Sequence, residues 1–159
     1  MKKALIISIL FFVIKANGQN LFFIGEKSYP CTESISLQSN KEEGKDLNVL
    51  FAKDNSKAYF VVNTKPSLNS EFSGKLIIYL DDGTVITCND ISEYDYVDNI
   101  AKAVYALTKE QLNKMRNSNL NTVRYTLNVL GVKEVNHSAS NKGSSTKTNF
   151  PDLISEFFK

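Results

Sequence analysis

Residues 75–90 read KLIIYLDDGTVITCND, an apolar run followed by two acids, a glycine and a second β-prone run. Asp-Gly between two such runs is a strong hairpin signal, because a type I′ turn requires positive φ at both central positions. With Asp82 and Gly83 at those positions, Leu80 faces Val85. The stretch therefore predicts an antiparallel hairpin, and it assigns the acids to the turn rather than to a cation site.

Further strands are expected on both sides of this hairpin. Residues 47–53 and 57–65 are β-rich runs separated by Asp54-Asn55-Ser56, which favours a tight turn. Residues 100–107 form another β-prone run, and residues 120–129 alternate apolar with polar side chains, as expected for a strand with one buried face. Residues 66–74, rich in Pro, Ser, Asn and Gly, are expected to form a loop.

A helix is expected from Thr108 to about Arg116. Thr108 and Gln111 have the spacing of a capping box, in which two side chains satisfy the free backbone amides of the first turn. The Asn117-Ser118-Asn119 sequence then ends the helix.

Composition changes abruptly over residues 136–149, which contain mainly Ser, Thr, Asn, Lys and Gly. Such a segment buries little apolar surface, so it is predicted to be a flexible linker. Beyond it, residues 150–159 carry one apolar helical stripe and predict a short amphipathic helix that must dock on another surface. The candidate interaction residues are those of the stripe: Phe150, Leu153, Ile154, Phe157 and Phe158.

These patterns predict a mainly β protein. We expect an antiparallel sandwich-like or curved sheet of about seven strands with two short helices, and a single β-rich globular domain over residues 19–135. The alternative is an α+β arrangement in which both helices cover one face of a single antiparallel sheet.

The N-terminus has the pattern of a bacterial signal peptide over residues 1–18: two lysines, an apolar run that is too short to span a bilayer, and Ala16-Asn17-Gly18 before the expected cleavage site. After cleavage no membrane span is expected, and 16 basic residues face 17 acidic ones, because the leader holds three of the 19 basic residues and no acid. Without a net positive charge or a basic stripe, nucleic-acid binding is not expected. The chain is therefore predicted to be secreted or periplasmic.

Cys31 and Cys88 are the two cysteines of the chain. Export would bring them into an oxidising compartment, where an even number of cysteines favours pairing. A disulfide between them is the expectation, and two buried free thiols are the alternative.

Few residues suggest catalysis or metal binding. The single histidine, His137, falls in the expected linker, where nothing would hold a general base in place. The acidic segment after Cys88 offers weak calcium candidates, Asp90, Glu93, Asp95 and Asp98, without the ligand spacing of an EF-hand. A solvated loop is the simpler interpretation, and no cofactor is expected.

The sequence thus favours a secreted or periplasmic non-enzymatic binding module, whose partner is an unknown protein or envelope component. A structural accessory domain without a small-molecule ligand is the second hypothesis. A small hydrolase is the third, because paired carboxylates alone can support glycoside hydrolysis.

Overall fold

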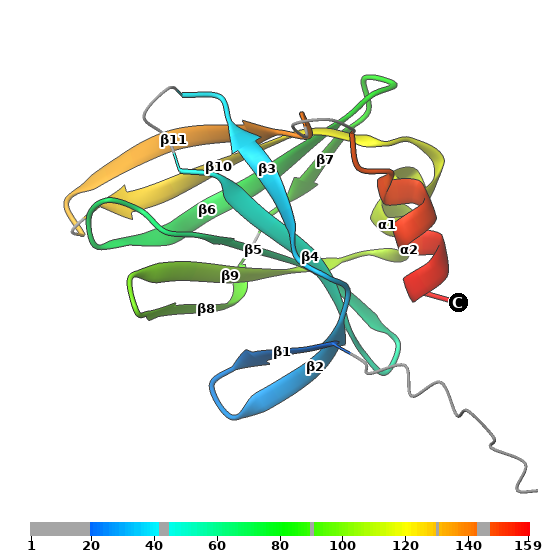
Figure 1. The fold of residues 1–159 in the computed structure, drawn as a ribbon, viewed down its shortest axis with the longest axis horizontal. Coiled ribbons are helices and arrows are strands. Elements are labelled where there is room, and N and C mark those ends of the chain that lie inside the picture. The colour runs from blue at the N-terminus through cyan, green and yellow to red at the C-terminus, as the bar shows by residue number, and fades with distance from the viewer. Residues whose placement is uncertain (1–19, 42–44, 90, 130, 143–146) are drawn as a thin grey trace, which may run out of the picture.

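The computed structural model describes residues 20–41, 45–89, 91–129, 131–142 and 147–159 (Figure 1). The expected leader and Asp90 lie outside these residues. The described part of the chain contains eleven strands and two helices: β1 (Asn20–Ile24), β2 (Lys27–Cys31), β3 (Ile35–Ser39), β4 (Leu47–Asp54), β5 (Lys57–Thr64), β6 (Ser70–Leu80), β7 (Val85–Cys88), β8 (Ile91–Val97), β9 (Ile100–Leu107), α1 (Lys109–Asn117), β10 (Leu120–Val129), β11 (Lys133–Ser140) and α2 (Phe150–Phe157).

The strands form one antiparallel sheet in the order β7-β6-β10-β11-β3-β4-β5-β9-β8, with β2 also paired to β4 and β1 paired to β2. The sheet folds over so that β6 faces β8 and β9, yet no ladder joins its ends and it remains open. Figure 1 shows β6, β10 and β11 above β5, β9 and β8, with both helices together at one side. The mainly β class is confirmed, but the expected number of about seven strands is wrong.

Two of the predicted local structures are confirmed with small changes. β4 and β5 pair from Asn48–Asn63 to Asp54–Lys57 across a two-residue turn, in which Asn55 has a φ of 51°. Helix α1 has the complete capping box: Gln111 N donates to Thr108 Oγ1 and Thr108 N donates to Gln111 Oε1. Local side-chain chemistry therefore sets both features.

The β6–β7 hairpin exists, but its predicted register is wrong by one residue. Tyr79, not Leu80, pairs with Val85, and the loop contains three residues, 81–83. Gly83, with a φ of 84°, is the left-handed residue that follows the turn, and Asp82 Oδ1 accepts a 2.8 Å bond from the amide of Thr84. The observed register places Ile78 opposite Ile86, and both side chains are buried. Because a shift by one residue would turn one strand's buried side chains toward solvent, burial of this face fixes the register.

Strand β6 is also longer than predicted, because residues 70–74 of the expected loop extend it. Gly74 has a φ of 63°, and the pairing with β10 shifts register at this point, where Arg124 faces Ile77 but Thr126 faces Ser73. The bulge bends the strand. Tyr105 of β9 donates a 3.4 Å hydrogen bond to the carbonyl of Gly74, across the region where β9 faces β6.

The expected linker needs correction over residues 136–140, which are the last five residues of β11. This strand pairs with β10 from Val129–Lys133 to Thr122–Ser140, and with β3 through Ala139–Ser39 and Ser140–Gln38. The linker prediction from composition is wrong here because the segment is held by ladder hydrogen bonds and by burial of Ala139. These interactions take the place of the large apolar side chains that the segment lacks. His137 consequently lies on a strand.

Two apolar clusters fill the protein. The main core lies inside the folded sheet and includes side chains from most strands and both helices, among them Phe51, Phe60 and Tyr105. The satellite core lies under the β1–β2 hairpin and is small: Phe22, Ile24, Cys31, Leu50, Ala52, Val61 and Val104. Strands β4, β5 and β9 contribute to both clusters, so both of their faces are covered.

The two cysteines form no disulfide, and the predicted bridge is wrong. Cys31 is buried in the satellite core, whereas Cys88 is buried in the main core opposite Leu76. An even number of cysteines says nothing about which side of a sheet each one occupies. Burial raises the pKa of both thiols, and that of Cys88 reaches about 11.

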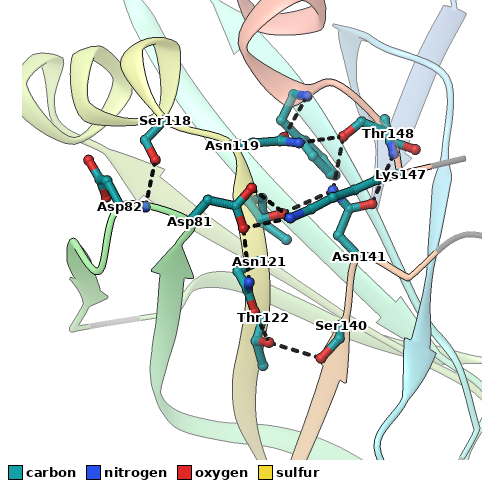
Figure 2. A network of polar contacts seen from close by, with 12 residues as sticks. Asp81, Asp82, Ser118, Asn119, Asn121, Thr122, Ser140, Asn141, Lys147 and Thr148 are labelled. Atoms are coloured by element: carbon teal, nitrogen blue, oxygen red, sulfur yellow. Dashed lines mark hydrogen bonds and ion pairs between the residues drawn. The ribbon is translucent and has the colours of Figure 1, made fainter.

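A polar network fixes the chain just before α2 (Figure 2). Lys147 Nζ contacts the two carboxylate oxygens of Asp81 at 2.5 and 2.6 Å, beside the loop of the β6–β7 hairpin. The side chains of Asn119 and Asn141 both donate to the carbonyl of Thr148, at 3.0 and 2.9 Å. Residues 147–149 are thereby attached to the sheet, and this attachment sets where α2 begins.

Candidate functional site

A cavity of about 430 Å³ beside the helices brings several basic residues together. The β4–β5 turn, one side of α1 and the residues that follow α2 form its walls. Five of its lining residues are basic and none is acidic; we call it the cationic cavity, after Lys53, Lys57, Lys109, Arg116 and Lys159.

Two of these cations have a structural partner. Lys53 Nζ donates a 2.8 Å hydrogen bond to the carbonyl of Phe157 and lies 4.5 Å from the centre of its ring. Arg116 Nη2 donates at 3.2 Å to the carbonyl of Phe158. Both therefore satisfy carbonyls at the C-terminal end of α2, where positive charge is favourable.

Arg116 is not fully used by these contacts. Its Nη1 donates to Asn113 Oδ1 at 3.3 Å, while its buried Nε has no hydrogen-bond partner. Lys57 and Lys109 are exposed, and neither forms an ion pair among the described residues. The ammonium groups of Lys57 and Lys109 are therefore available to a ligand.

Helix α1 adds to the positive potential because its N-terminus opens onto the cavity at Thr108 and Lys109. The aligned peptide dipoles place partial positive charge at this end of a helix. Leu112 and Phe158 supply apolar surface within the same wall. The cavity can accordingly hold an anionic group attached to a small apolar part.

The three calcium candidates within the described residues, Glu93, Asp95 and Asp98, form no cluster of metal ligands there. Glu93 forms a 2.9 Å ion pair with Lys27, which raises the pKa of that lysine. Asp95 lies opposite Lys102 in the register of β8 and β9. Asp98 lies in the β8–β9 turn with a φ of 54°. No group of three or more potential metal ligands occurs among the described residues, of which Asp90 is not one.

The candidate interaction residues at the C-terminus contact the protein's own core. Phe150 and Ile154 are fully buried, and Leu153, Phe157 and Phe158 are half-buried against the same cluster. No helix within the described ranges has the length and apolarity needed to cross a membrane.

Sequence reasoning missed the cationic cavity, because its basic residues come from β4, β5, α1 and the chain end. Each is an isolated lysine or arginine in the sequence, and only folding brings them together. Comparison of the chain with protein-family models, curated proteins and solved structures finds no match.

Proposed function

We propose that the protein is an exported, non-enzymatic binding module that holds an anionic group in the cationic cavity. The observation that carries this proposal is the clustering of five basic residues, without an acid, around one cavity. Export is supported by the leader-like pattern of residues 1–18.

The charge of the cavity is a local property. Without the leader the chain has slightly more acidic than basic residues. The absence of Asp and Glu from the lining of the cationic cavity is therefore not a consequence of overall composition. The five like charges repel one another, and a bound anion would reduce this repulsion. A phosphate, sulfate or carboxylate can pair with the exposed lysine ammonium groups.

The size of the cavity is appropriate for a small ligand or for one anionic side chain of a larger partner. Its volume of about 430 Å³ lies within the range of small-molecule sites. The exposed position of Lys57 and Lys109 leaves the cavity open to such a partner.

Calorimetric titration with inorganic phosphate and with sulfate at low salt tests the site. We expect saturable binding that the double substitution Lys57→Gln and Lys109→Gln weakens at least tenfold. Sodium chloride at physiological concentration also weakens it, because the screening length is then only about 8 Å.

The matched control is the double substitution Lys75→Gln and Lys133→Gln, which removes the same charge from exposed positions outside the cavity. Equal weakening by both double variants would mean that net charge, rather than the cavity, attracts the anion. A mature N-terminus at Gln19 tests the exported part of the proposal.

A further inference from the structure

A second cavity, of about 200 Å³, lies at the other end of β5 from the cationic cavity. It is bounded by the β5–β6 loop and by the inner faces of β10 and β11, where the folded sheet opens. Eight residues of β5 separate the two sites by about 23 Å. We call it the apolar cavity, because most of its surface comes from Pro66, Leu68, Tyr125, Leu127, Val129 and Val135. The other lining residues are Thr64, Ser67, Ser70, His137 and the exposed Lys45.

One wall of the apolar cavity is a stacked pair of rings. Tyr125 and His137 face each other across β10 and β11, with ring centres 5.4 Å apart and planes inclined by 17°. Burial lowers the pKa of His137, assisted by the charge of Lys41, and raises that of Tyr125 to about 12. Both rings are therefore neutral at pH 7.

Two of the polar side chains around the cavity already have partners in the protein. Thr64 Oγ1 donates at 3.0 Å to the carbonyl of Asp46, and Ser70 Oγ donates at 2.8 Å to the carbonyl of Leu68. No hydrogen bond to a ring nitrogen of His137 is formed within the described parts of the chain. A neutral imidazole has one donor and one acceptor nitrogen, so His137 can bond a ligand in either direction.

The size and chemistry of the walls define what would fit. An apolar cavity of about 150 Å³ accommodates benzene, so 200 Å³ has room for one ring system slightly larger than benzene. A buried charge would be costly beside neutral rings and aliphatic side chains. Leu68 lines the cavity but is 58% exposed, and a ligand would cover it.

We propose that the apolar cavity binds a small, uncharged aromatic molecule with a single hydrogen-bonding group, in the size range from phenol to indole. The ring would lie in the apolar cavity beside the stacked pair, and its hydrogen-bonding group would contact His137. This site shares no lining residue with the cationic cavity, so it stands or fails independently of the proposed function.

Indole is the probe for the first test. The protein has no tryptophan, so fluorescence excited beyond tyrosine absorption reports the probe alone. We expect saturable binding, and indole-induced NMR shifts centred on Tyr125, Leu127 and His137. Shifts centred elsewhere, or an absence of saturable binding, would overturn the proposal.

Val135→Phe fills the cavity and should weaken indole binding at least tenfold. Val132→Phe is the matched control, because Val132 is 88% exposed in the β10–β11 turn and does not line the cavity. Equal affinity in both variants would place indole at another site. The NMR mapping on the unsubstituted protein decides the question even if Val135→Phe fails to fold.

The hydrogen bond is tested by comparing indole with indene, which has the same shape but no N–H group. We expect the unsubstituted protein to prefer indole several-fold, and His137→Phe to abolish this preference while indene still binds. Tighter binding of indole-3-carboxylate than of indole would overturn the assignment of an uncharged ligand.

Discussion

The main core and the satellite core are built on opposite faces of the same strands, but they differ in how they are closed. The main core is enclosed by the folded sheet and by both helices. The satellite core is covered by the β1–β2 hairpin alone. The consecutive residues Val49 to Ala52 of β4 are all buried. Because successive side chains of a strand point to opposite faces, both faces of β4 must be covered by other parts of the protein. The comparison indicates that cover from several elements gives cooperative stability, whereas a single hairpin can open locally.

Phe51→Ala should have the largest effect on the main core. Phe51 is fully buried and its ring packs against Phe60, Phe150 and Phe158, with ring centres 5.2 to 6.2 Å apart. We expect the free energy of unfolding in urea to fall by about 3–5 kcal/mol. Val132→Ala, at an exposed position, should change it by less than about 0.5 kcal/mol.

Ile154→Ala tests whether α2 belongs to the main core. Ile154 is fully buried, so its truncation should lower the free energy of unfolding by about 2–4 kcal/mol. The neighbouring Leu153 is half-buried, and Leu153→Ala should cost only about 1 kcal/mol. Equal and small effects of both substitutions would show that α2 does not contribute to the folded core in solution.

Phe22→Ala should act mainly on the satellite core, with a cost of about 1.5–3 kcal/mol, the transfer free energy of one buried side chain. The two cysteines provide probes of the two regions. In native protein at mildly alkaline pH, we expect Phe22→Ala to accelerate labelling of Cys31 by a thiol reagent without accelerating that of Cys88. Parallel acceleration of both thiols would mean that the two cores open together.

The ion pair between Lys147 and Asp81 should contribute least. Both side chains are more than one third exposed, so solvent screens the pair and Lys147→Met should cost at most about 1 kcal/mol. Hydrogen bonds from Lys147 and Asn121 lower the pKa of Asp81 below its ordinary 3.8. The contribution is therefore fully present above about pH 4 and disappears as pH falls through the lowered pKa. Urea unfolding of both proteins at pH 7 and pH 2 should show the difference at pH 7 only.

The features that the sequence predicted correctly depend on neighbouring residues. Asp54-Asn55-Ser56 specifies a turn, and Thr108 with Gln111 specifies a helix start, because the relevant hydrogen bonds are made within a few residues. The apolar alternation of residues 120–129 likewise identified β10.

The incorrect predictions depend on partners distant in the chain. Strand β11 has few large apolar residues, and it exists because β10 and β3 pair with its two edges. The positions of Cys31 and Cys88 follow from which face each strand presents, and spacing along the chain does not encode that. The same reason applies to both cavities, whose lining residues converge only in the folded sheet.

The short pairing between β11 and β3 also has a consequence for the order of events during synthesis. Asn40 bonds Ser138 and Ser140, which lie 98 and 100 positions further along the chain. Closing so long a loop is slow. Because the chain is synthesised from its N-terminus, β3 cannot pair with β11 until residue 140 has emerged. The two halves of the sheet therefore join late, and the growing chain remains without a closed core for most of its translation.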